Sequence, residues 1–236
     1  AKRAVKLSSE TASKPYDGEP LTRPDVKIEA GSFVAGEVTE LKATGSVTNV
    51  SDGIVTNTIV VIPGENFNEN NYNIERNEGK LSIQSTELDV SKVKWTTQDV
   101  EKTYDGVAHP AGTATAVDEY GNALEVQYSA DGVTWTTLSA DITAKNVADS
   151  KTVQLRATSP NYNSDQYATN SEKITITERE LTITSVNADK RYDGTPLTKH
   201  EANVSGDGFA KGEGADYAFT GSQTDVGSSK NEFSYT

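Results

Sequence analysis

The tripeptide Tyr-Asp-Gly occurs three times at a constant spacing of 88 residues, and this period constrains the fold more than any other feature of the chain. A lysine precedes each tyrosine by two residues. Self-similarity at one period is the signature of a chain built from repeated structural units. The three copies are Tyr16, Asp17 and Gly18; Tyr104, Asp105 and Gly106; and Tyr192, Asp193 and Gly194.

The first and third units belong to one subtype, because residues 18–22, 36–37 and 44–46 match residues 194–198, 212–213 and 220–222 at an offset of 176. The middle unit shares the tripeptide and an Asn-Tyr-Asn marker, at 71–73 and 161–163, but its residues 126–136 have no counterpart. We therefore predict repeat 1 at 1–85, a divergent repeat 2 at 86–178 and repeat 3 at 179–236. At the 176-residue offset repeat 3 is C-terminally truncated: it ends at the positions of Ile59 and Val60 and lacks a last strand or two.

Short runs of alternating apolar and polar residues predict strands throughout the chain. Examples are residues 5–7, 80–83, 152–157, 174–176, 181–183 and 217–219. The middle unit's first strand is expected within 88–95, and single helical turns at 33–37 and 209–213. The pattern predicts an all-β chain of tandem small β-sandwich (Ig-like) domains joined end to end, with small β-grasp-like units as the alternative. About three residues separate the strands at each joint, too few for a flexible linker.

The tripeptide itself has the composition of a turn that follows a strand. Aspartate can bond the backbone two residues on, glycine accepts a positive φ, and the tyrosine ring can cover the end of a thin core with its hydroxyl in water. Because the motif is present in every unit, including the divergent one, we interpret it as a structural turn rather than a binding or catalytic site.

Composition excludes several classes of function. The formal charge of −13 argues against a nucleic-acid partner, since phosphate binding needs a basic face. The absence of cysteine excludes disulfides and thiolate sites, and two histidines, His109 and His200, leave little for a zinc site. No apolar run is long enough for membrane insertion. No phosphate-binding loop and no nucleophile elbow are present, so we expect that the chain is not an enzyme. A hydrolase is the class to be tested against this expectation.

Cofactors and metals are not expected, although calcium is an alternative. Oxygen-rich clusters could supply hard ligands, but none has EF-hand spacing. Trp95 and Trp135 lie in strand patterns and are predicted to be core residues rather than sugar-stacking platforms. The candidate calcium ligands are Glu65, Asn66, Asn68, Glu69, Asn70 and Asn71, or Asp207, Glu213 and Asp216.

Residues 190–198, 206–213 and 220–227 resemble the YDG-type repeats of bacterial cell-surface adhesins, and the middle unit resembles their MBG-type, bacterial Ig-like repeats. The first unit departs from the pattern at Pro15, and the second at residues 107–110. The resemblance implies an extracellular, wall-attached or secreted protein in which such units form a non-catalytic stalk, with neighbouring repeats as partners. It carries no catalytic residues, and ligand-binding residues stay unknown. The alternative is direct binding of a host glycan or glycoprotein, of mucin or immunoglobulin type, by one repeat.

Overall fold

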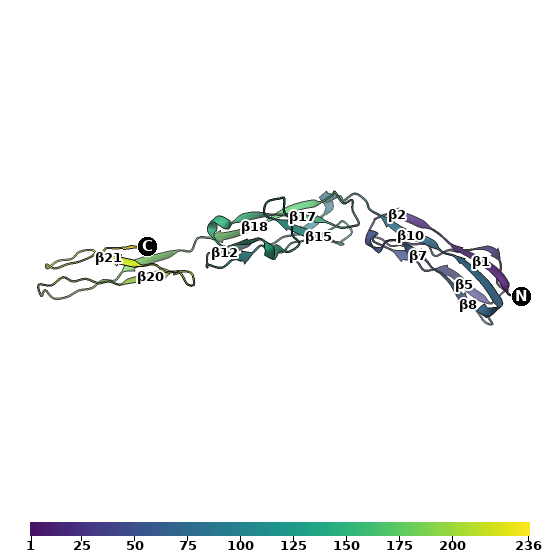
Figure 1. The fold of residues 1–236 in the computed structure, drawn as a ribbon, viewed down its shortest axis with the longest axis horizontal. Helices are drawn as coiled ribbons and strands as arrows, with labels where there is room; N and C mark the ends of the chain where they lie inside the picture. Colours follow the sequence, from purple (N-terminus) through teal and green to yellow (C-terminus); the bar gives the residue numbers. More distant parts are fainter. The chain divides into compact units, whose positions relative to one another are not determined.

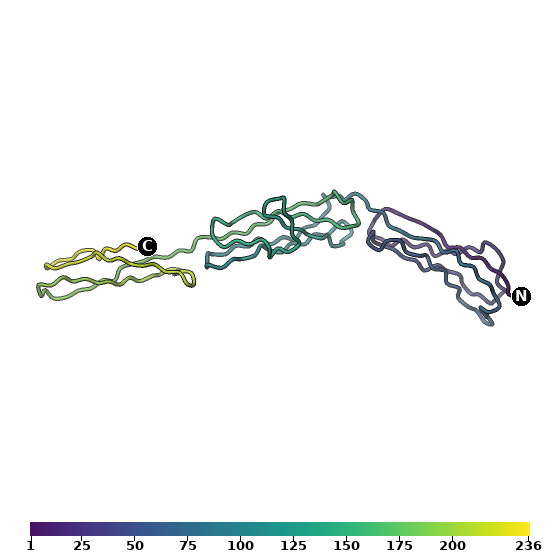
Figure 2. Tube along the Cα trace, in the orientation of Figure 1, coloured from purple at the N-terminus to yellow at the C-terminus, as the bar shows by residue number.

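The computed structural model describes residues 1–236, and its chain is all-β, as predicted: 22 strands are interrupted only by five short 3-10 helices. Figure 1 labels about half of the strands, and the trace in Figure 2 runs back and forth along each repeat. Contacts group the residues into two compact units: residues 1–96, 114–127 and 155–170 form the first, and residues 97–113, 128–154 and 171–236 form the second. The division into three repeats stays a prediction, and we use repeats 1, 2 and 3 as names for the three sequence ranges.

The first unit contains all of repeat 1 and part of repeat 2. Its strands are β1 (Arg3–Ser9), β2 (Ala12–Pro15), β3 (Leu21–Thr22), β4 (Val26–Gly31), β5 (Val38–Ala43), β6 (Ser46–Val47), β7 (Val55–Asn57), β8 (Ile59–Pro63), β9 (Tyr72–Asn77), β10 (Gly79–Gln84), β11 (Lys94–Thr96) and β14 (Thr115–Val117). The 3-10 helices are η1 (Val50–Asp52), η2 (Glu69–Asn71) and η3 (Val90–Lys92).

The second unit contains the rest of repeat 2 and all of repeat 3. Its elements are β12 (Val100–Thr103), β13 (His109–Pro110), β16 (Thr143–Ala144), β19 (Leu181–Ser185), β20 (Ala202–Gly206), β21 (Tyr217–Phe219), β22 (Phe233–Tyr235), η4 (Ser139–Asp141) and η5 (Val147–Asp149). Three strands pass through both units: β15 (Ala123–Ser129), β17 (Lys151–Thr158) and β18 (Ala168–Thr177). Repeat 2 is built on one six-stranded sheet in the order β11-β14-β15-β17-β18-β12.

Two layers of strands enclose the first core of repeat 1. The sheet β4-β1-β9 supplies Val5, Leu7 and Tyr72, and the pair β5-β8 supplies Ile59; these four residues form one buried cluster. Alternation along β1 explains the packing, since Val5 and Leu7 point inward while Lys6 forms an ion pair with Glu75 on the outside.

The strand before each of the first two tripeptides pairs in parallel with the last strand of its repeat. In repeat 1, β2 pairs with β10, and in repeat 2, β12 pairs with β18. The first strand of repeat 2, expected within 88–95, is shorter than that stretch, because Asp89 accepts a hydrogen bond from the backbone N–H of Ser91 and starts η3. Only β11, which pairs with β14, forms in that stretch.

Repeat 3 consists of two antiparallel pairs, β19-β20 and β21-β22. Tyr217 is opposite Tyr235, as Leu41 is opposite Val61 in repeat 1. The strand pairing therefore aligns Tyr235 with Val61, and the expected alignment with Ile59 is wrong by two residues. The loop between the paired strands is two residues shorter in repeat 3, which a constant offset does not detect.

An asparagine that bonds backbone groups marks the same position in both repeats of this subtype. The Asn57 side chain, fully buried, donates to the carbonyls of Glu10 and Arg23 and accepts from the N–H of Gly45. Asn231 donates to the carbonyls of Val186 and Lys199, which lie 176 residues after Glu10 and Arg23. Each asparagine thus ties three chain segments of its repeat together, because it satisfies backbone groups that strand pairing leaves open.

Candidate functional site: the tyrosine joints

Each Tyr-Asp-Gly segment is a tight turn, and the first two follow directly on strands β2 and β12. The three glycines have φ angles of 79°, 80° and 74°, a region that favours glycine. Asp17, Asp105 and Asp193 each accept a hydrogen bond from the backbone N–H two residues on. Lys14 and Lys190 hold the pKa of Asp17 and Asp193 below the usual range, and the backbone bonds add to the effect. The pKa of Asp105 is lowered first by its backbone bond and then by His109.

The parallel strand pairing explains where the first two tyrosines lie. The N–H of Tyr16 donates to the carbonyl of Gln84, and the N–H of Tyr104 donates to the carbonyl of Thr177, so both hydrogen bonds continue the parallel ladders. Gln84 and Thr177 are the last residues of their repeats' final strands. Each tyrosine is therefore delivered to the end of its repeat at which the next repeat begins.

Tyr16 contacts repeat 2 directly, and we call this contact the first joint. Its side chain is 3% exposed. Its hydroxyl donates to Oδ2 of Asp118 at 3.2 Å, and Nδ2 of Asn122 donates to that hydroxyl at 2.8 Å. The ring packs edge-on against Tyr120 and Tyr162, with centroids 5.7 and 5.5 Å away. The expectation that the tyrosine hydroxyl faces water is wrong for Tyr16.

Asp118 is the acceptor at the centre of this joint, and it is itself buried. Its Oδ1 accepts from the backbone N–H groups of Tyr120 and Asn122, which fixes the carboxylate within its own loop. Its Oδ2 accepts from two phenols, those of Tyr16 and Tyr162. Burial raises the pKa of both phenols, and Asp118 adds to the effect. One carboxylate thus binds one tyrosine from each repeat.

An apolar core surrounds the polar contacts of the first joint. A single cluster of buried side chains joins Leu21, Val47, Leu81 and Ile83 of repeat 1 to Leu88, Leu124 and other residues of repeat 2 through Tyr16 and Tyr162. Asn161 adds hydrogen bonds from repeat 2 to Asn49 and to the N–H of Val50. The first joint therefore has a shared hydrophobic core, and its order does not depend on hydrogen bonds alone.

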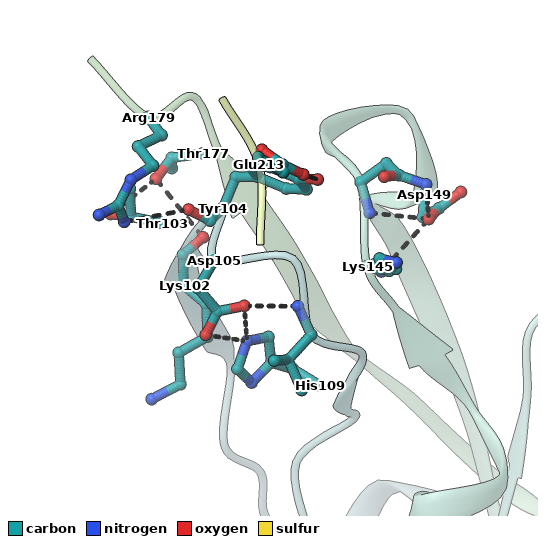
Figure 3. A network of polar contacts seen from close by, with 12 residues as sticks. Lys102, Thr103, Tyr104, Asp105, His109, Lys145, Asp149, Thr177, Arg179 and Glu213 are labelled. Atoms are coloured by element: carbon teal, nitrogen blue, oxygen red, sulfur yellow. Dashed lines mark hydrogen bonds and ion pairs between the residues drawn. The ribbon is translucent and has the colours of Figure 1, made fainter. Parts of the chain in front are cut away.

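The second joint uses the same turn and different partners (Figure 3). The hydroxyl of Tyr104 donates to Oε1 of Glu213 in repeat 3. Glu213 raises the pKa of the Tyr104 phenol through this hydrogen bond. The guanidinium of Arg179 donates to the carbonyls of Asp207 and Gly208 and, at 3.4 Å, to that of Tyr104. Arg179 thus connects the turn of repeat 2 to the loop that receives it.

The glycines of the two joints face the following repeat. A Cβ atom on Gly18 would lie 2.6 Å from Cγ of Tyr120, and one on Gly106 would lie 3.6 Å from Cβ of Ala210. A Cβ atom on Gly194 would have nothing within 4 Å beyond its own chain neighbours, and Tyr192 is 60% exposed. The third turn thus has the backbone of the other two without a receiving partner.

The sequence pattern names the Tyr-Asp-Gly residues but does not predict the residues that receive the tyrosines. The expected helical turns at 33–37 and 209–213 are present as single turns, with N–H to carbonyl bonds from Glu37 to Val34 and from Glu213 to Ala210. The only ligand-binding role that the sequence suggests for Glu213 is as a calcium ligand. One sequence feature could have drawn attention to Glu213: it lies 176 residues after Glu37 within a matched loop. No matched repeat position points to Asp118.

The remaining candidate residues lie partly beside the joints and partly elsewhere. His109 contacts the Asp105 carboxylate at 3.0 Å, and His200 stacks on Phe219. No group of three or more His, Cys, Asp or Glu side chains is arranged to hold a metal ion. Glu69 is paired with Arg76. Trp95 is partly buried against the shared core of the first joint. No helix is long and apolar enough to cross a membrane.

Comparisons with known proteins add little to this description. No protein-family model and no curated protein match the chain. Among solved structures, the chain is similar to three N-terminal domains of the highly immunogenic outer capsid protein (Hoc) of bacteriophage RB49, at 11% identity and a TM-score of 0.30, over 92% of this chain and 73% of that one. A TM-score this low supports no conclusion about fold or function. The resemblance to YDG-type and MBG-type repeats stays a prediction.

Proposed function

We propose that this chain is a non-catalytic stalk segment of a secreted or wall-anchored bacterial surface adhesin, in which Tyr-Asp-Gly turns fix each repeat to the next. The observation that carries the proposal is the first joint: Tyr16 of repeat 1 is buried in repeat 2, with its phenol on Asp118. The proposed location on the bacterial surface is supported by the resemblance of the repeats to those of cell-surface adhesins. A stalk must hold its far end at a defined distance from its base, so its joints must be stiff. A joint with a shared core and directional hydrogen bonds restricts bending.

The turn suits this role because its position is determined by the strands on both sides. Tyr16 is bonded through its backbone to the last strand of its own repeat and through its side chain to the next repeat. Movement of one repeat against the other would have to break a buried hydrogen bond between a phenol and a carboxylate. The net charge of −13 keeps such a segment soluble and opposes unspecific association.

The test measures how far repeats 1 and 2 move relative to each other at the first joint. Spin labels are attached at Lys27→Cys and Glu125→Cys, on exposed positions of repeats 1 and 2, in a chain that has no other cysteine. We expect a narrow distribution of label distances that broadens in Tyr16→Ala. Tyr192→Ala, the same motif residue in an exposed turn, is the matched control and should leave the distribution unchanged. A broad distribution in the unsubstituted chain would contradict the proposal.

A further inference from the structure

One parallel ladder of hydrogen bonds joins the first strands of repeat 1 to its last ones. The strand β1 pairs with β9 over residues 3–8 and 72–77, and β2 pairs with β10 over residues 12–15 and 81–84. Both pairings are parallel and follow one another along the chain. They therefore form two parts of one ladder, which is about 40 Å long from the rise of a strand.

Side chains carry this parallel ladder across the gap between its two parts. The backbone N–H of Gly79 donates to Oγ of Ser9 at 2.9 Å, and the N–H of Lys80 donates to Oγ1 of Thr11 at 3.0 Å. The backbone hydrogen bond that Tyr16 donates at the first joint closes the ladder at its far end. The ladder is therefore bonded from one end of the repeat to the other.

The parallel direction decides how a lengthwise pull acts on the repeat. Arg3 begins β1 beside Tyr72, whereas Gln84 ends β10 beside Pro15, so Arg3 and Gln84 lie at opposite ends of the ladder. The hydrogen bonds of a parallel pair are evenly spaced and run across the strands. A pull between Arg3 and Gln84 therefore strains all of them together, whereas a pull between Arg3 and Tyr72 would open them one after another.

Side chains on both faces of the ladder oppose sliding as well. Val5 and Leu7 of β1 and Leu81 of β10 are buried, and on the outer face Lys6 forms an ion pair with Glu75, its partner in register, at 2.9 Å. A slip of one residue exchanges the inner and outer faces of a strand. Sliding would thus bring Val5 and Leu7 into water, so the core holds the register of the ladder.

Repeat 2 has a shorter form of the same arrangement. The strand β12 pairs in parallel with β18 over residues 100–103 and 174–177, and the backbone bond of Tyr104 continues this pairing. At its start, the N–H of Lys173 donates to Oδ1 of Asp99 at 2.7 Å. A parallel ladder that ends at the Tyr-Asp-Gly turn is therefore common to both repeats.

We infer that repeat 1 has a mechanical function: the parallel ladder between residues 3–16 and 72–84 resists tension applied between the two ends of the repeat. The inference rests on the proposed function, because a stalk that connects two bodies is pulled lengthwise when they move apart. The chain contains no cysteine, so this resistance comes from strand pairing and packing without a disulfide. The ladder ends beside Tyr16, so the load leaves repeat 1 at the first joint.

The test pulls single molecules of the full chain in two directions. Cysteine handles at Lys2→Cys and Gln84→Cys load the ladder lengthwise, and handles at Lys2→Cys and Asn73→Cys separate its two sides at one end. All three positions are exposed, and the chain has no other cysteine. At one loading rate we expect a severalfold higher unfolding force for the lengthwise handles, because forced unfolding reports the barrier along the direction of pull. Equal forces in the two directions would overturn the inference.

Two matched variants show whether the ladder itself carries the load. Thr11→Val removes the hydroxyl that accepts from Lys80, whereas Thr39→Val removes a hydroxyl that donates to the carbonyl of Ile62 in the pair β5-β8, outside the ladder. With the lengthwise handles we expect Thr11→Val to lower the unfolding force and Thr39→Val to leave it unchanged. Chemical denaturation shows that each variant is folded.

An equal loss of force in Thr11→Val and Thr39→Val, or a loss in neither, would overturn the inference. The proposed function has its own readout in the spin-label distances across the first joint. A narrow distance distribution together with equal forces in the two directions would leave the joint standing and remove only the mechanical function of the ladder.

Discussion

At the scale of single residues, Glu172 conflicts most with its surroundings. It occupies an inward position of the alternation along β18, is 1% exposed, and neither carboxylate oxygen has a hydrogen-bond partner. Burial raises the pKa of Glu172, and Asp99 adds to the effect; the backbone N–H of Gln98 is near enough to lower it in part. The folded chain therefore holds a proton at this site more tightly than the unfolded chain does.

The sign of the pH effect follows from this raised pKa. The contribution of Glu172 to stability is full below its unfolded pKa of about 4 and is lost as pH rises towards the folded value. We expect Glu172→Gln to raise the free energy of unfolding at pH 7 by about 1 kcal/mol and to change little at pH 3. Chemical denaturation at both pH values measures this. Glu101→Gln, on an exposed position of β12, is the control; an equal gain there would contradict the explanation.

At the scale of elements, the turns differ in what their glycines contact. Gly18→Ala would place a methyl group against Tyr120 and force a residue with a Cβ into a φ of 79°. Gly194→Ala would also force a residue with a Cβ into a positive φ, of 74°, but its methyl group would meet no neighbour. We expect Gly194→Ala to cost about 1 kcal/mol and Gly18→Ala about 2–3 kcal/mol, because the joint must open to make room. Thermal unfolding of the two variants gives the comparison, and equal costs would mean that Tyr120 moves aside freely.

The elements also show which parts of the fold the sequence could predict. Alternation and the 88-residue period predicted the strands at Val5, Leu81 and Ile174 and the three turns, because both patterns are local. The partners of the tyrosines were missed because they lie in the next repeat and at different repeat positions, Asp118 in one case and Glu213 in the other. A repeat period aligns equivalent residues of different units; it does not report which residues of neighbouring units touch.

At the scale of the whole molecule, the joints should make the chain sensitive to alkali. The pKa values of the Tyr16 and Tyr162 phenols are raised, so their contribution to stability is full below about pH 10 and is lost as pH rises towards the folded values. We expect the unfolding midpoint to fall steeply above about pH 10 in the natural sequence and less steeply in Tyr16→Phe with Tyr162→Phe. A pH titration followed by phenolate absorbance should show two tyrosines that ionise late in the natural sequence. The titration of the double variant should lack these two late-ionising groups. Ionisation of all tyrosines in one step with the fold intact would contradict the joint.

Each joint has a polarity, with the turn on one repeat and the acceptor on the next, and this polarity affects how such a chain can evolve by gain and loss of repeats. Each joint takes its turn from the preceding repeat and its acceptor from the following one, and Asp118 and Glu213 serve as acceptors in different surroundings. A gene duplication or deletion of 88 codons that preserves the frame therefore brings a turn next to an acceptor again, whichever repeats are joined. The acceptor loops are free to diverge separately, while the Tyr-Asp-Gly turn has to stay the same, since every new neighbour must be able to receive it.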